Sequence, residues 1–308
     1  MFSRGFRSLC IVGATLCTCV GCEDHSKDPA QRITVNRSVP VVFAVNYPLK
    51  YFAERIAEDL ARVEFPAPRG GDPAFWKPTP ETIIAFQQAD LILLNGAGYS
   101  KWVEYSTLPA SRMLNTSEGF THAYIRAESA SLHAHGPGAA HVHGDLAFTT
   151  WLDPTLAIQQ ARAIHGGFTR LLPTQADLLD RRYESLKQEL ERLDVKLREA
   201  TSKFRGHPMV ASHPVYQYFA RRYGLDLRSV HWEPDEMPSE EQWAALQSLL
   251  ENHPARWMIW EAPPLPEVKN RLRQLNVECL VVLPCANVPG DSDWLTVMFE
   301  NARLLHEQ

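Results

Sequence analysis

A run of about 30 residues near the middle of the chain has the pattern of one uninterrupted α-helix. Apolar residues recur at helical spacing from Leu178 to Leu197 among many Arg and Glu residues, and neither Gly nor Pro interrupts the run before Gly206. We expect Thr174 to cap this helix. A helix of about 30 residues spans about 45 Å, which is longer than a small α/β domain needs. The run therefore predicts a rigid strut that lies along two domains.

Buried strands alternate with helices on both sides of this strut. Before it, we expect strands at 39–45, 62–65 and 91–94 with helices at 50–61 and 80–88. After it, we expect strands at 209–211, 227–230, 257–260 and 279–283 with helices at 214–223, 240–251 and 293–305. Such alternation is typical of parallel sheets with helices on their faces. The predicted fold class is therefore α/β, with two lobes of parallel sheet flanked by helices and joined by one long helix.

The predicted domains follow from this pattern. We expect an N-terminal α/β lobe at 39–166, the connecting long helix at 167–205 and a C-terminal α/β lobe at 206–308.

The N-terminus has the features of an export signal. Two arginines precede an apolar run from Leu9 to Val20, which is too short for a membrane span but suits a signal peptide. The run ends in small residues before Cys22, which resembles a bacterial lipobox. We expect a lipoprotein signal peptide at 1–22, a lipid on Cys22 and a polar tether at 23–38. The alternative is a plain signal peptide. In either case we expect the protein to be exported, to the periplasm or the cell surface.

Composition and motifs narrow the class of function. The chain of 308 residues has a net charge of −5 and no basic stripe, which argues against nucleic-acid binding. It contains no Walker loop, no GxSxG and no HExxH motif, so we expect no enzyme. Removal of the leader would leave Cys279 and Cys285 in the folded part, where we expect two buried thiols rather than a disulfide bond.

Residues 133–143 read HAHGPGAAHVH and indicate contact with a transition metal. Neutral imidazole is the commonest protein ligand for metals such as zinc. A Gly- and Ala-rich coil could wrap a cation with the side chains of His133, His135, His141 and His143. The alternative is a solvated low-complexity loop with weak affinity for metals.

Several segments of the chain, taken in order, resemble one known family. The segments are FWKPTPETIIAFQQADLILLNGAGYSKWV (75–103), TTWLDPTLAIQQA (149–161), the strut helix, VASHPVYQYFARRYGL (210–225) and PGDSDWLTVMFEN (289–301). The family that they resemble is the metal-binding solute receptors of bacterial ABC transporters, which take up zinc or manganese. The resemblance implies two α/β lobes joined by a long helix, with a metal in the cleft between them and no catalysis.

The resemblance also implies where the metal ligands lie. The histidine of the SHP segment and the aspartate of the GDS segment are ligands in the family, and they match His213 and Asp291. Each follows a predicted strand, and ligands of α/β sheets bind beyond the carboxyl ends of strands. The family's other two ligand positions match Ala74 and Thr149. Alanine cannot bind a metal and threonine rarely does, so this site departs from the family pattern.

Other residues could supply the missing ligands. His231 follows a predicted strand, and His143 or His141 could enter the cleft from the histidine-rich segment. A site of His213, Asp291, His231 and His143 would suit tetrahedral zinc. Weaker candidates are His133, His135, Glu233, Glu261 and Asp72. The alternatives are that the histidine-rich segment alone binds metal, or that the cleft takes a different ligand.

Each strong candidate also has a purely structural interpretation. His213 could flank the start of a helix, Asp291 could be a helix N-cap, and His231 could be a packed core residue.

The expected function is an exported, lipid-anchored, monomeric solute-binding protein. It would bind zinc, or manganese as the alternative, and deliver it to an ABC permease driven by an ATPase. A histidine rather than a glutamate at position 213 favours zinc. The alternatives are an accessory metal carrier, an adhesin-type lipoprotein with a degenerate site, or a metallohydrolase, which would need an open metal position and a general base.

Overall fold

The computed structural model describes residues 39–127, 132–134, 140–142 and 146–308, and for 132–134 and 140–142 it describes the backbone alone. All of these residues belong to one compact unit. The predicted signal peptide at 1–22, Cys22, the tether at 23–38, His135 and His143 lie outside the described residues. No helix in the described part has both the length and the hydropathy needed to cross a membrane.

The first lobe is built on a four-stranded parallel sheet in the order β2-β1-β3-β4. Its strands are β1 (Val41–Ala44), β2 (Arg62–Glu64), β3 (Leu91–Leu94) and β4 (Met113–Asn115), and its helices are α1 (Tyr47–Ala57), α2 (Pro80–Gln88) and α3 (Pro154–Leu171). Helix α1 was predicted at 50–61 but begins earlier, because the Asn46 side chain accepts a hydrogen bond from the N–H of Leu49 and caps the first turn. Strand β4 had no predicted counterpart because it is short and only partly buried.

The second lobe repeats this design with a parallel sheet in the order β10-β9-β7-β8. Its strands are β7 (Pro208–Ala211), β8 (Asp226–Ser229), β9 (Trp257–Trp260) and β10 (Glu278–Val281), and its helices are α5 (Gln217–Tyr223), α6 (Glu240–Asn252) and α7 (Pro266–Gln274). A reciprocal capping box between Ser239 and Gln242 starts α6. The prediction of two parallel-sheet lobes is confirmed.

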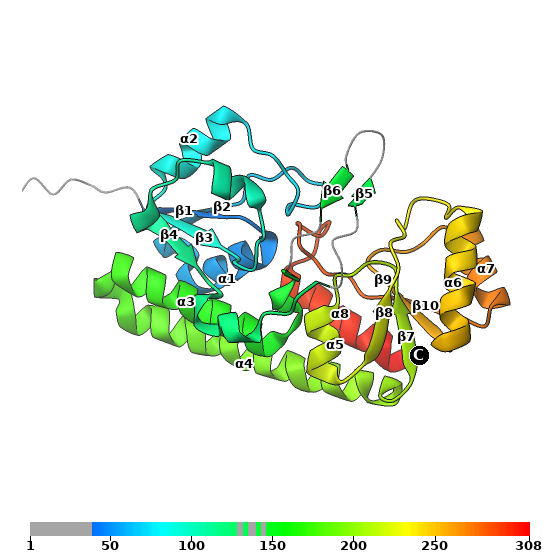
Figure 1. Ribbon diagram of the computed structural model, residues 1–308. Helices are drawn as coiled ribbons and strands as arrows, with labels where there is room; N and C mark the ends of the chain where they lie inside the picture. Colours follow the sequence, from blue (N-terminus) through cyan, green and yellow to red (C-terminus); the bar gives the residue numbers. More distant parts are fainter. Residues whose placement is uncertain (1–38, 128–131, 135–139, 143–145) are drawn as a thin grey trace, which may run out of the picture. The chain divides into compact units, whose positions relative to one another are not determined.

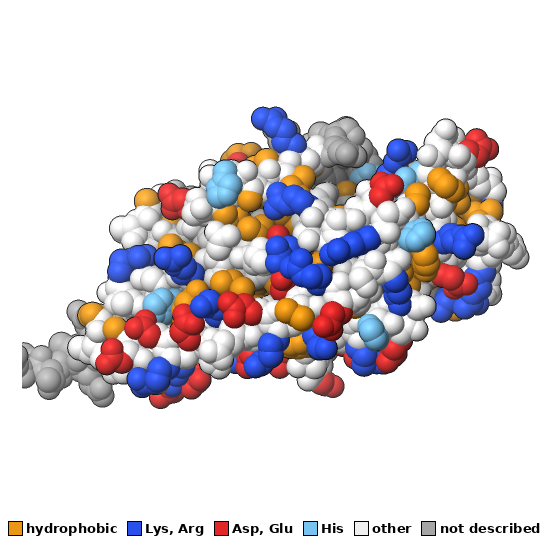
Figure 2. All heavy atoms as spheres, turned by 90° about the horizontal axis from the view of Figure 1, so that it is seen from below, with side chains coloured by type: hydrophobic (Ala, Val, Ile, Leu, Met, Phe, Trp, Pro, Cys, Tyr) orange, Lys and Arg blue, Asp and Glu red, His pale blue; other side chains and the backbone are white. Residues whose placement is uncertain are grey.

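The predicted strut is helix α4 (Ala176–Thr201), whose 26 residues span about 39 Å. It runs along both lobes (Figure 1). The prediction that Thr174 caps this helix is wrong, because Pro173 opens a 3₁₀ turn at Pro173–Gln175 that leads directly into the helix. The expected connecting segment 167–205 therefore contains the end of α3, this turn and then α4. The face seen from below in Figure 1, where α4 lies, carries interspersed acidic and basic side chains (Figure 2).

The C-terminal helix α8 (Trp294–Glu307) joins the two lobes. Its first residue, Trp294, is fully buried, and its ring centroid lies 5.0 Å from that of Phe52 and 5.9 Å from that of Tyr51, both on α1. One hydrophobic cluster consequently runs through both lobes. Asp291 was a candidate N-cap of this helix, but Asp293 is the N-cap, since its carboxylate accepts a hydrogen bond from the N–H of Thr296.

A small antiparallel hairpin lies in the histidine-rich segment, which was predicted to be coil. Strands β5 (Leu132–Ala134) and β6 (Ala140–Val142) place the backbone of His133 opposite that of His141. An isolated bridge between Arg126 and Leu146 lies at the base of this hairpin.

Candidate metal centre

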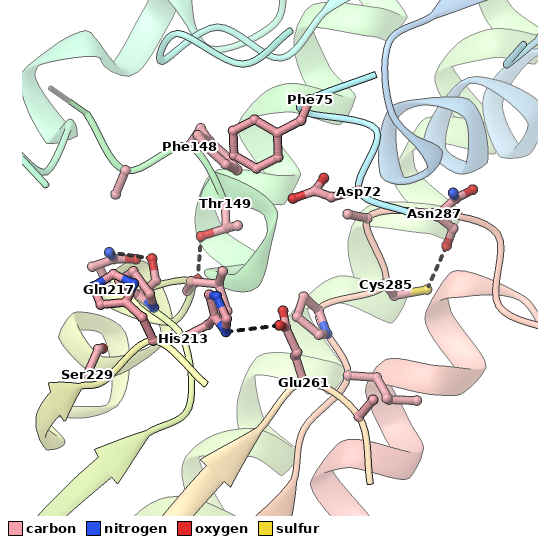
Figure 3. A pocket seen from close by; sticks show the side chains of 18 of the residues that line it. Asp72, Phe75, Phe148, Thr149, His213, Gln217, Ser229, Glu261, Cys285 and Asn287 are labelled. Atoms are coloured by element: carbon pink, nitrogen blue, oxygen red, sulfur yellow. Dashed lines mark hydrogen bonds and ion pairs between the residues drawn. The ribbon is translucent and has the colours of Figure 1, made fainter. Parts of the chain in front are cut away.

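A cavity of about 1010 Å³ lies between the two lobes. The first lobe lines it with residues from three segments, 71–75, 125–127 and 146–149. The second lobe lines it with loops that follow its strands. Figure 3 shows Asp72, Phe75 and Phe148 facing His213 and Glu261 across this space. The cavity thus lies where a parallel α/β sheet is expected to bind its ligand, beyond the carboxyl ends of the strands.

Three potential metal ligands meet on the second-lobe wall. His213 follows β7, Glu233 follows β8 and Glu261 follows β9. The strands β8, β7 and β9 are neighbours in the sheet, so the loops after them emerge side by side. Each of the three side chains offers one ligand atom, and these atoms all lie within 4.8 Å of one another. The order of the strands therefore assembles the cluster from residues that are distant in sequence.

Hydrogen bonds hold the imidazole of His213 in a defined orientation. Its Nδ1 lies 3.0 Å from the carbonyl oxygen of Trp232, and because a carbonyl can only accept, Nδ1 carries the hydrogen. Nε2 then faces Glu233, with 3.3 Å between Nε2 and Oε1. The N–H of Trp232 donates to the carbonyl of Ser212 over 2.8 Å, so the loops after β7 and β8 are tied together. This arrangement leaves Nε2 as the ligand atom of a neutral His213.

The charges around His213 alter its protonation. Burial by itself would lower the pKa of the imidazole, but the hydrogen bond to Glu233 and the negative charges of Glu261 and Glu233 outweigh burial, and the pKa is raised above its ordinary value. Glu261 Oε1 lies 3.3 Å from Nδ1. A proton therefore competes with any metal for this site, and metal binding must weaken as the pH falls.

Two further titratable residues line the same cavity. The ring of His231 stands at 86° to that of His213, with 5.9 Å between their centroids. Asp72 comes from the first lobe, and its Oδ1 accepts a hydrogen bond from the N–H of Ala74 over 2.8 Å. Asp72 is thus the described carboxylate that the first lobe presents to the cavity.

The two positions at which the sequence departs from the expected ligand pattern contribute differently to the cavity. Ala74 is buried and has no ligand atom. Thr149 lines the cavity, and its hydroxyl donates a hydrogen bond to the carbonyl of Val215 in the other lobe. Next to them, the rings of Phe75 and Phe148 pack edge to face, 6.3 Å between centroids. The first-lobe wall is therefore largely apolar.

The structure does not bring all of the candidate ligands together. His213, Glu233 and Glu261 form the cluster and His231 lies beside it, whereas Asp291 is exposed and lies outside the described cavity lining. His133 and His141 are described in backbone only, and His135 and His143 lie outside the described residues. Glu261 was a weaker candidate than His213 in the sequence analysis. It nevertheless follows β9 as His213 follows β7, and the sequence alone shows that each residue follows an apolar strand.

The chemistry of the cluster fits a divalent transition metal. Zinc bonds of about 2.0–2.1 Å in a tetrahedral site place ligand atoms roughly 3.3 Å apart, and Nε2 of His213 lies 3.3 Å from Oε1 of Glu233. One imidazole and two carboxylates are a mixed nitrogen and oxygen set that suits zinc and also manganese.

Comparison with known proteins finds relatives that are named for zinc. The chain is 25% identical over 229 residues to the high-affinity zinc uptake system protein ZnuA of Bacillus subtilis, covering 70% of this chain and 68% of that protein. It is 22% identical over 279 residues to the zinc-binding lipoprotein AdcA of Streptococcus pneumoniae, covering 85% of this chain and 54% of AdcA. The chain thus spans about half the length of the AdcA relative.

Solved structures share the fold. The metal-dependent lipoprotein YcdH of Bacillus subtilis matches with a TM-score of 0.73 at 20% identity, over 88% of this chain and 99% of that one. The Zn(II)-bound ZnuA-like domain of Streptococcus pneumoniae AdcA matches with a TM-score of 0.72 at 19% identity, over 88% and 98%. The manganese complex of FpvC from Pseudomonas aeruginosa matches with a TM-score of 0.69 at 21% identity, over 87% and 96%.

A family model described as the periplasmic component A of the zinc-uptake complex, ZnuA, matches residues 42–308. This range contains both lobes, the connecting helix and the three clustered potential ligands, and the chain therefore belongs to the ZnuA family of zinc-uptake components.

Proposed function

We propose that this protein captures a zinc ion in the cavity between its lobes and delivers it to an ABC permease powered by a separate ATPase. It would act outside the cytoplasm, tethered by a lipid on Cys22. The observation that carries the proposal is the meeting of His213, Glu233 and Glu261 at the carboxyl ends of three neighbouring strands. No chemical conversion of the metal is part of this function.

The residues in and around the cluster would have different roles in metal binding. Nε2 of His213 and the carboxylates of Glu233 and Glu261 would contact the ion. The carbonyl of Trp232 fixes the His213 ring, and so the imidazole loses little rotational freedom on binding. His231 and Asp72 line the same cavity and would complete the coordination or hold water molecules that do so.

Zinc is proposed over manganese because of the imidazole donors. His213 and His231 would favour zinc, whereas manganese prefers carboxylate, carbonyl and water ligands. Relatives named as zinc-binding or zinc-uptake proteins support this choice. The two glutamates leave manganese as the metal to test against zinc.

The test is a zinc titration of the protein in competition with a chelator of known affinity. We expect one site tighter than about 1 µM, which corresponds to about 8 kcal/mol. A structural zinc site with four ligands binds with about 10–16 kcal/mol in total, which is about 2.5–4 kcal/mol for each ligand. His213→Ala and Glu233→Gln should each weaken binding by roughly 100- to 1,000-fold.

Two exposed residues outside the cavity lining provide matched controls, His122→Ala and Glu236→Gln. Both should retain the affinity of the unmodified protein. Weak binding at several sites that His213→Ala leaves unchanged would contradict the proposal and would favour the histidine-rich segment 133–143 as the only metal-binding element. Tighter binding of manganese than of zinc would reassign the metal.

A further inference from the structure

The cavity is far larger than a metal ion requires. Its volume is about 1010 Å³, whereas a water molecule occupies about 30 Å³, so an ion with a few bound waters needs only on the order of 100–200 Å³. Pockets for small organic ligands measure about 300–1,000 Å³. The space beside the cluster is therefore the size of a small-molecule site.

The wall that faces the cluster has the chemistry of an organic-ligand site. Phe75 and Phe148 form an edge-to-face pair there, and Tyr99 packs edge to face on Phe148 from behind, with 5.2 Å between centroids. Pro214 and Pro263 add apolar surface from the second lobe. Apolar surface gives nothing to a hydrated ion but gains free energy by covering carbon atoms. A ligand that has carbon atoms on one side and a metal on the other would match both walls.

The charge of the cavity restricts which chelates it accepts. Among the described lining residues, Asp72, Glu233, Asp235 and Glu261 are acidic, and Arg126 is the basic one. A metal complexed by a polycarboxylate carries net negative charge and would be repelled. A metal complexed by one amino acid through nitrogen donors remains positively charged and would be attracted.

We propose that the cavity binds zinc together with one small nitrogen-donor chelator, of the class of a free amino acid, for which L-histidine is the probe. His213, Glu233 and Glu261 hold the metal. The chelator takes the coordination positions that His231, Asp72 or water would otherwise fill, and it covers Phe75 and Phe148. This inference rests on the proposed function, because it requires that the cluster bind metal. It assigns to the protein a substrate class, cationic zinc chelates, in place of the naked ion.

The experiment equilibrates the protein with zinc alone, with zinc and excess L-histidine, and with zinc and excess citrate, and then records native mass spectra. We expect the histidine sample to show the mass of one protein, one zinc and one histidine, with zinc occupancy retained. We expect citrate to strip the zinc and to give no ternary mass. The inference would be overturned, and the proposed function left intact, if the protein binds zinc when zinc is added alone but loses it to histidine without forming a ternary species. No bound zinc in any sample would overturn both.

A variant isolates the apolar wall. Phe75→Ala should weaken the ternary complex at least about tenfold and change the affinity for zinc alone by less than about threefold. Phe75→Leu, which keeps an apolar side chain, should retain most of the ternary affinity. The control is Tyr105→Ala, since Tyr105 is 86% exposed and lies outside the cavity lining. Equal loss of zinc-only and ternary binding in Phe75→Ala would overturn the inference.

Discussion

In the metal-free protein, Glu233→Gln should change the stability with a sign that depends on pH. The ligand atoms of Glu233 and Glu261 lie within 4.8 Å of each other. With His213 neutral and both carboxylates charged, two negative charges at this distance repel each other by about 3.5 kcal/mol at an effective dielectric constant of about 20. About a quarter of each glutamate side chain is exposed to solvent, so we expect a net repulsion of about 1–3 kcal/mol.

Protonation of His213 reverses this balance. Its pKa is raised in the folded protein, mainly because Glu233 and Glu261 outweigh the effect of burial. The imidazolium therefore adds stability that is fully present below the unfolded-state pKa of about 6.5 and is lost as the pH rises through the higher folded-state pKa. At about pH 5.5 the Glu233→Gln variant loses an ion pair and should unfold at a lower temperature. At about pH 9 it loses a repulsion and should unfold at a higher temperature.

The assay is thermal unfolding of chelator-treated, dialysed protein at these two pH values. A change of 1 kcal/mol moves the midpoint by about 2–4 °C in a chain of this size, so the variant should gain roughly 2–12 °C at about pH 9. Glu236→Gln, at an exposed position, should show no such reversal. A Glu233→Gln midpoint that shifts in the same direction at both pH values would refute the reasoning.

Three other predictions concern stability and reactivity. Trp294→Ala should lower the free energy of unfolding by about 3–5 kcal/mol, because a fully buried ring that packs α8 on α1 is lost. Denaturant unfolding measures this change, and a loss below about 1 kcal/mol would contradict this role of Trp294. Asp194→Ala should cost about 2–4 kcal/mol at pH 7, because Arg222 donates a hydrogen bond to the Asp194 carboxylate over 2.8 Å. Burial opposes ionisation of Asp194, but Arg222 and a second arginine lower its pKa. This stability is therefore present above the unfolded-state pKa of Asp194 and is lost as the pH falls through its folded-state pKa. Burial raises the pKa of Cys285 to about 12 and that of Cys279 to about 11, so a thiol reagent at about pH 8 should react with the native protein far more slowly than with the unfolded one, and equal rates would be inconsistent with the structure.

The fold was predictable wherever a pattern was long and periodic. The leucine repeat predicted α4, and apolar runs such as 91–94 predicted strands, because burial of one face or of both faces imposes a regular spacing. Helix ends were less predictable. Thr174 has a side chain that can cap a helix, but Pro173 begins a 3₁₀ turn that contains it. At the N-terminus of α8, Asp293 rather than Asp291 is the N-cap. Capping depends on backbone geometry that the residue type alone does not define.

The candidate site was likewise predictable in part. His213, Glu233 and Glu261 follow strands, so the sheet order settles where they meet, and each was among the candidates. Asp291 lies in a loop beyond the cavity lining, where the path of the loop rather than the strand determines its place. Whether His141 or other histidines of 133–143 bind metal stays a prediction. The apolar pair of Phe75 and Phe148 could not be predicted, because it joins segments far apart in sequence through tertiary packing.

The three clustered donors all belong to one sheet, and this has a consequence for unloading. In a receptor whose donors are shared between lobes, separation of the lobes dismantles the site. In the proposed function, movement of the first lobe away from the second would withdraw Asp72 and expose the ion while leaving His213, Glu233 and Glu261 in place. Departure of the metal would then proceed by ligand exchange, in which donor atoms of the acceptor replace protein atoms one at a time. The rate of transfer would be determined by the acceptor's chemistry more than by the opening of the receptor.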